Sequence, residues 1–184
     1  MAGRGVRACL LAATLAASLT ACVAPNPPAP WYGMSRPAAA QSPLRWHWAQ
    51  SADDLPDADI YVLDVFTTPS ATVSELHAID RRAVCYLPVG VVAADRPDLD
   101  RFPPAQVGPD GILNWDRHDR LTPIITDEVR LCRDKGFDGV VLGELATVPR
   151  DVLSYLIEEA HRIDLPVALV DRTHPRMDYT VPAR

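Results

Sequence analysis

The chain has 184 residues, a length that suits one domain and at most a small second one. Hydrophobic residues make up 48% of it and charged residues 23%, so its composition is that of a globular protein and excludes wholesale disorder and collagen-like repeats. The formal net charge of −6 argues against a protein that binds nucleic acid.

Residues 1–21 have the pattern of a bacterial export signal. Two arginines precede an uncharged, largely apolar stretch at 8–19, which is too short to span a bilayer comfortably. The sequence Leu-Thr-Ala-Cys at 19–22 resembles a lipobox, in which the cysteine is lipidated and becomes the new N-terminus. We therefore expect a lipid on Cys22 that holds the protein to a membrane of the bacterial cell envelope, outside the cytoplasm. An ordinary signal peptide with an incidental cysteine is the alternative.

Residues 22–42 are rich in proline and alanine. Proline at this density neither continues a helix nor joins the interior of a sheet, so we expect an extended tether. The folded domain is then expected at 43–184.

Within this domain, short apolar runs alternate with amphipathic segments. Continuous apolar runs, as opposed to alternating ones, are typical of strands covered on both faces, as in a parallel sheet. Five strands are expected, at 45–49, 60–66, 83–89, 140–142 and 167–170.

The amphipathic segments predict three helices. The first lies between the second and third strands and is expected to bury Ile79. Thr122 would cap the second helix, with Pro123 at its first position. The third would open at Pro149 and carry Tyr155 on its apolar side. Strand–helix–strand repeats of this length predict right-handed parallel crossovers and an α/β fold.

The segment between residues 91 and 119 breaks this alternation. It is rich in proline, aspartate and glycine and contains Trp115. Because it follows a strand, it should lie over the C-terminal ends of the strands, where α/β folds keep their sites.

Several motifs follow one another in a recognisable order. They are Trp-x-Trp at 46–48, Tyr-x-x-Asp-x-Phe at 61–66, a third strand with Cys85, Tyr86 and Gly90, Arg-Pro-Asp at 96–98, and Lys-Gly-Phe-Asp-Gly-Val at 135–140. Together they resemble the endo-α-1,4-polygalactosaminidase-like glycoside hydrolases, the family 114 type, over about 46–171. The resemblance implies a TIM-barrel fold and hydrolysis of an amino-sugar polysaccharide.

The chain departs from this family's pattern in ways that bear on activity. After Gly-Phe-Asp-Gly-Val the family typically has acidic and amide residues, whereas this chain has Val-Leu-Gly-Glu at 141–144. A closed eight-stranded barrel typically needs ~250 residues, more than 43–184 supplies. We therefore expect a shortened TIM-barrel-like repeat of about five parallel strands, with weak or absent activity. A non-catalytic carbohydrate-binding or envelope scaffold lipoprotein is the alternative.

Glycoside hydrolysis ordinarily needs two carboxyl groups facing each other across the sugar bond. Three acidic residues are predicted near strand C-terminal ends: Glu144, Asp64 and Asp171. The alternatives are an exposed loop residue for Glu144, a salt-bridged core acid for Asp64, and a surface ion pair for Asp171. Asp138 opens its strand and is expected to be structural, because that end of a barrel serves stability.

Four aromatic residues are candidates to stack on sugar rings: Trp46, Trp48, Tyr86 and Trp115. Ordinary core packing is the alternative for each, and Trp115 in the long loop has the strongest functional case. The histidine spacing indicates no metal site, and no phosphate-binding loop appears, so neither metal nor cofactor is expected.

Cys85 on a strand and Cys132 on a helix are expected to be two buried thiols, although an exported protein can also form a disulfide. The expected partners are a polysaccharide and, through the lipid on Cys22, a membrane. A homodimer that completes the barrel between two chains is a further possibility.

Overall fold

The computed structural model describes residues 44–49, 55–170 and 172–182. The predicted signal peptide, the tether with Cys22, and the candidate Asp171 lie outside these residues. No helix of the described part is long and apolar enough to cross a membrane.

Five parallel strands form one sheet in which the spatial order follows the chain. They are β1 (Trp46–Ala49), β2 (Ile60–Asp64), β3 (Arg82–Pro88), β4 (Gly139–Gly143) and β5 (Val167–Leu169). The prediction of an α/β fold with about five parallel strands is confirmed. Each apolar run became a strand because both faces of the sheet are covered.

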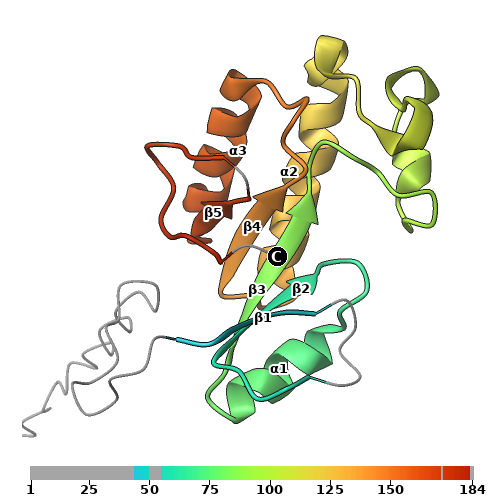
Figure 1. Ribbon diagram of the computed structural model, residues 1–184. Helices are drawn as coiled ribbons and strands as arrows, with labels where there is room; N and C mark the ends of the chain where they lie inside the picture. Colours follow the sequence, from blue (N-terminus) through green and yellow to red (C-terminus); the bar gives the residue numbers. More distant parts are fainter. Residues whose placement is uncertain (1–43, 50–54, 171, 183–184) are drawn as a thin grey trace, which may run out of the picture.

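Three helices pack against one face of this sheet (Figure 1): α1 (Ser70–Ala78), α2 (His118–Asp134) and α3 (Arg150–Arg162). Their apolar sides and the outward strand residues, such as Leu63 and Leu142, form the main core. Sequential parallel strands with helices on one face correspond to an arc of a TIM barrel.

The opposite, inner face of the sheet carries a second, smaller core. Residues two apart on a strand share a face, and Val62, Val84 and Val141 lie together here with Tyr179. This face corresponds to the interior of a barrel.

The prediction of two buried thiols is wrong, because Cys85 and Cys132 form a disulfide. Cys85 lies on the outer face of β3 and Cys132 on the buried side of α2, and their Cα atoms are 5.8 Å apart. Sequence periodicity placed each cysteine on an apolar face. It could not reveal that α2 sets its Cys132 directly against β3.

The second helix begins earlier than predicted. It starts at His118, so Thr122 is not its cap and Pro123 lies inside the helix. Asn114 provides the actual start signal, since its side chain accepts a hydrogen bond from the backbone N–H of Asp116. That bond caps a short 3₁₀ turn, Trp115–Arg117, which runs directly into α2.

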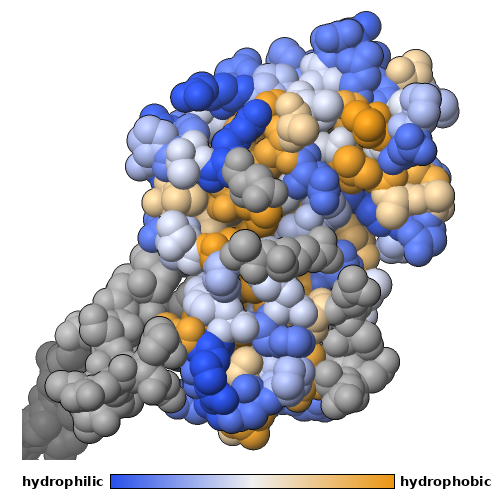
Figure 2. Space-filling model, in the orientation of Figure 1, coloured by the Kyte–Doolittle hydropathy of each residue, from blue (hydrophilic) through white to orange (hydrophobic). Residues whose placement is uncertain are grey.

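Two predicted core residues are instead exposed. Ile79 is 63% exposed because it is the C-cap of α1, where the helical period ends. Tyr155 is 40% exposed because it lies outside the buried side of α3, which includes Val152 and Leu156. The large hydrophobic residues that are exposed in the described part of the chain come from separate segments. Figure 2 shows hydrophobic patches among hydrophilic ones on this face of the molecule.

The segment at 91–119 is an ordered loop beyond the C-terminal end of β3 (Figure 1), built from four short 3₁₀ turns. Its apolar residues, including Phe102 and Leu113, pack into the main core. Trp115 is buried with them, 5% exposed, so the prediction that it offers an open platform for a sugar is wrong. The loop folds back on the helices, which the sequence did not reveal.

Candidate functional site

A pocket of about 500 Å³ opens at the C-terminal ends of β1, β2 and β3. This is the end of the sheet where TIM-barrel enzymes keep their active sites. The pocket is lined by inner-face strand residues and by the following loops: Trp48, Ala49, Val62, Asp64, Phe66, Thr67, Tyr86, Pro88, Ala93, Asp95, Arg96 and Pro97.

A second hollow of about 520 Å³ lies between α2 and α3, on the outer side of the sheet. It is lined by helix-surface residues that include His118, Asp127 and Tyr155. Because this hollow is lined only by residues of α2 and α3, whereas strand residues and the loops that follow them line the pocket above β1–β3, we take that pocket as the candidate site.

Asp64 ends β2 and lines the pocket. Its Oδ1 accepts hydrogen bonds from the backbone N–H groups of Phe66 and Thr67, at 2.8 and 3.0 Å, and from the Thr67 hydroxyl at 3.3 Å. This is an Asx-type turn, in which an aspartate satisfies the backbone that follows it. Asp64 therefore lines the candidate pocket and also fixes the loop after β2.

Lys135 supports this loop from the outer side. Its Nζ donates to the carbonyl oxygens of Val65 and Thr68, at 2.6 and 2.8 Å. Burial lowers the pKa of Lys135, and the nearby charge of Asp64 opposes that effect. The side chain of Asp64 and that of Lys135 thus both hold the turn that follows β2.

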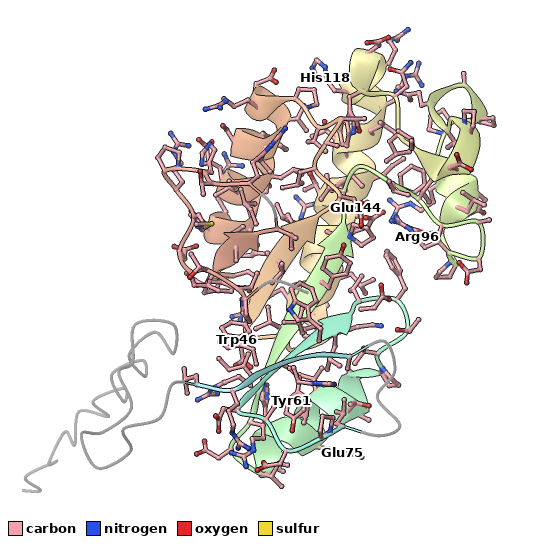
Figure 3. The ribbon with its side chains drawn as sticks, in the orientation of Figure 1. Trp46, Tyr61, Glu75, Arg96, His118 and Glu144 are labelled. Carbon is pink, nitrogen blue, oxygen red and sulfur yellow. A yellow bond between two sulfur atoms is a disulfide. The ribbon has the colours of Figure 1, made fainter. Side chains whose placement is uncertain are left out.

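Glu144 follows β4 and is exposed at the same end of the sheet (Figure 3). It adopts a left-handed backbone conformation with φ of 55°. Its Oε1 accepts a hydrogen bond of 3.4 Å from the hydroxyl of Tyr86. Tyr86 lines the pocket and is the register partner of Asp64, so it lies between the two candidate acids.

Two glycines make room for this arrangement. A Cβ on Gly143 would lie 2.5 Å from the ring of Tyr86, and a Cβ on Gly90 would overlap the carbonyl oxygen of Glu144. Neither position can carry a side chain unless Tyr86 or the turn that presents Glu144 moves.

Gly90→Ala is therefore expected to lower the free energy of unfolding by about 1–3 kcal/mol, the usual range for overpacking. The cause is displacement of the backbone at Glu144. Urea denaturation provides the measurement. Gly108→Ala is the matched control and should cost less, because its Cβ would meet one atom, the carbonyl oxygen of Ile112, at 3.1 Å. Equal losses in the two variants would contradict the close packing of Gly90 on Glu144.

The aromatic candidates separate into two groups. Trp48 and Tyr86 line the pocket and pack edge to face, with ring centroids 5.5 Å apart. Trp46 lies deeper on the inner face, stacked on Tyr179 with centroids 6.1 Å apart. Trp48 and Tyr86 are thus the two that the structure brings to the site.

Arg96 lines the candidate pocket and was not among the candidate site residues that the sequence singled out. It lines the pocket yet is only 8% exposed, and its guanidinium lies over the rings of Phe66 and Phe102, at 4.4 and 4.9 Å from their centroids. It donates two hydrogen bonds to Asp98, at 2.8 and 3.2 Å, and pairs with Glu128. The Arg-Pro-Asp motif at 96–98 pointed to this loop, but Glu128, the partner of Arg96 on α2, is distant in the sequence.

Glu128 is buried in α2, 1% exposed. Burial raises the pKa of its carboxyl group to about 8, although the charge of Arg96 acts in the opposite direction. The Arg96–Glu128 pair joins the pocket loop to α2, the helix that the disulfide joins to β3.

Asp138 serves structure at the opposite end of the sheet, as predicted. Its Oδ2 accepts a 2.9 Å hydrogen bond from the backbone N–H of Ala83 and lies 2.9 Å from His77 Nε2. These contacts tie β4 to β3 and α1. Within the described residues, no group of three His, Cys, Asp or Glu side chains could hold a metal ion.

The chain is similar to known glycoside hydrolases in its sequence and in its fold. The sequence model of Glycoside-hydrolase family GH114 matches residues 23–181. A search of curated protein sequences gave no significant match. Among solved structures, Ega3 of Aspergillus fumigatus, in complex with galactosamine, is similar, with a TM-score of 0.64 and 22% identity. That match covers 74% of this chain and 65% of Ega3.

Two further structures are similar at lower identity. The glycoside hydrolase domain of PelA from Pseudomonas aeruginosa has a TM-score of 0.50 at 16% identity, covering 68% of this chain and 58% of that one. A noncanonic maltogenic α-amylase, AmyB from Thermotoga neapolitana, has a TM-score of 0.53 at 10% identity, covering 68% and 45%. These likenesses show a shared TIM-barrel-type fold, and the chain spans less than two thirds of each of the three proteins.

Proposed function

Because the chain belongs to glycoside hydrolase family GH114, we propose that the pocket above β1–β3 binds an amino-sugar polysaccharide, with weak or absent hydrolysis. The observation that carries this proposal is the meeting of aromatic rings and carboxyl groups in one pocket at the strand ends. The galactosamine bound to Ega3 supports the choice of ligand class.

The chemistry of the lining suits such a polymer. An amino sugar offers an apolar ring face and, when it is not acetylated, an ammonium group. Trp48 and Tyr86 provide aromatic surface for the ring face, and Asp64 and Asp95 provide carboxyl groups for the ammonium.

The same geometry favours weak hydrolysis. Cleavage needs an acid and a nucleophile or base on opposite sides of the bond. Asp64 uses one carboxyl oxygen for three hydrogen bonds to its own loop. Glu144 is exposed and reaches the pocket only through Tyr86. If cleavage occurs, these two residues are the acid and base that we assign to it.

Asp64→Asn and Glu144→Gln test this assignment with α-1,4-linked galactosamine oligomers as ligand. We expect the wild type to bind the oligomers and to release little product, and both variants to abolish what release there is. Calorimetry measures binding, and chromatography of the products measures cleavage. Product release that survives in both variants would overturn the assignment, and absence of binding by the wild type would overturn the proposed function.

We also propose attachment to the membrane of the cell envelope through a lipid on Cys22. The basic start, the short apolar stretch and the lipobox-like motif of the sequence support it. Mass spectrometry of the mature N-terminus is the test. A lipidated Cys22 is the expected result, and an unmodified residue at another position would contradict it. The homodimer predicted above stays a prediction, for which light scattering should give a doubled mass.

A further inference from the structure

Residues 176–182, which we call the strap, cross the inner face of the sheet. At one end the strap is fixed to β5 by two hydrogen bonds between Asp178 and Val167. The backbone N–H of Asp178 donates to the carbonyl oxygen of Val167 at 2.9 Å, and the side chain of Asp178 accepts from the backbone N–H of Val167 at 2.8 Å. The Asp178 carboxyl group also lies 2.7 Å from His161 Nε2 on α3. Figure 1 shows this red segment returning toward the middle of the sheet.

Tyr179 anchors the middle of the strap. It is 7% exposed within the inner-face core, where its neighbours include Val62 and Val141. Its hydroxyl donates a 2.9 Å hydrogen bond to the carbonyl of Val140 in β4, and its ring stacks on Trp46 of β1. One side chain thus connects strands that lie three positions apart in the sheet.

The far end of the strap reaches the pocket wall. The indole Nε1 of Trp48 donates a 3.2 Å hydrogen bond to the carbonyl of Pro182, while the ring of Trp48 packs against Tyr86. Trp46 and Trp48 are two residues apart on β1 and share the inner face, so the strap follows β1 from the stacked Trp46 to the pocket.

We propose that the strap positions Trp48 as a wall of the glycan pocket, with Tyr179 as the positioning residue. The inference rests on the proposed function for the role of Trp48. A tryptophan edge that keeps one orientation binds a sugar ring without first losing rotational freedom. The strap fixes that edge by accepting its N–H, and Tyr179 fixes the strap by filling the inner face beneath the pocket.

The first test follows the indole N–H of Trp48 in ¹⁵N-labelled protein, by nuclear magnetic resonance, with its signal assigned by the loss of that signal in Trp48→Phe. In Tyr179→Ala we expect this signal to shift and its hydrogen exchange to accelerate about fivefold or more, the equivalent of one lost hydrogen bond. Tyr179→Phe keeps the ring on Trp46 and should largely restore the wild-type signal.

The second test measures binding of galactosamine oligomers. Tyr179→Ala should raise the dissociation constant about fivefold or more, and Tyr179→Phe should bring it back toward the wild-type value. Asp178→Ala loosens the strap at β5 without opening a core cavity, so it provides the same readouts if Tyr179→Ala fails to fold.

An unchanged Trp48 signal in a folded Tyr179→Ala or Asp178→Ala variant would overturn the proposal. A shifted signal with unchanged oligomer affinity would also overturn it. A wild type that binds no oligomer would overturn the proposed function instead, while the indole signal would still report whether the strap holds Trp48.

Discussion

The double substitution of Cys85 and Cys132 by alanine is expected to lower the free energy of unfolding by at least about 4 kcal/mol. The disulfide links residues 47 apart in sequence, and a loop of that length restricts the unfolded chain by roughly this amount. Both cysteines are fully buried, so the lost packing adds to the effect. Chemical denaturation of the oxidised wild type and the double variant provides the measurement.

Reduction gives an independent control for this prediction. Wild-type protein treated with a reductant under denaturing conditions and refolded should approach the stability of the double variant, while the double variant itself should not respond to reductant. A double variant as stable as the oxidised wild type would show that the link between β3 and α2 contributes nothing measurable.

The free energy of unfolding is expected to decrease as the pH rises from about 5 to 8, because of Glu128. Burial raises the pKa of this carboxyl group to about 8 in the folded protein, above its ordinary value of 4.5 in an unfolded chain. Between these two values the folded state binds more protons than the unfolded state, so raising the pH favours unfolding. The slope is at most ~1.4 kcal/mol per pH unit, and the loss over the window amounts to a few kcal/mol.

Glu128→Gln separates this effect from the other titrating groups. Glutamine keeps the shape and an acceptor oxygen for Arg96 but has no proton to lose, so it should flatten the dependence between pH 5 and 8. At pH 8 the variant should be more stable than the wild type. Urea denaturation at several pH values is the measurement, and equal slopes in the two proteins would contradict a buried, proton-binding Glu128.

The sheet and the position of the site followed from local patterns in the sequence. Continuous apolar runs are enough to predict strands covered on both faces, and the ends of parallel strands gather at one edge. For that reason Asp64 and Glu144, far apart in the chain, are predicted near strand C-terminal ends, and in the structure Tyr86 lies between them.

Other features depend on how elements rotate against each other, which no local pattern records. Predicting the disulfide would require knowing how α2 is rotated about its axis where it packs on β3. Predicting the burial of Trp115 would require knowing that the loop at 91–119 folds onto the helices. The contact of Arg96 with Glu128 joins residues 32 positions apart through a buried hydrogen bond. The strap that places Tyr179 on the inner face has no sequence signature, because an isolated tyrosine after the last strand predicts nothing about its partner.

The central claim is that the pocket above β1–β3 binds an amino-sugar polymer through Trp48. Calorimetric titration of galactosamine oligomers into wild type, Trp48→Ala and Tyr155→Ala tests it most directly. Tyr155 is the matched control, an exposed aromatic residue in the hollow between α2 and α3. We predict that Trp48→Ala weakens binding about tenfold, as expected for a lost aromatic contact, and that Tyr155→Ala binds like the wild type. Wild-type affinity in Trp48→Ala, or an equal loss in Tyr155→Ala, would contradict the claim.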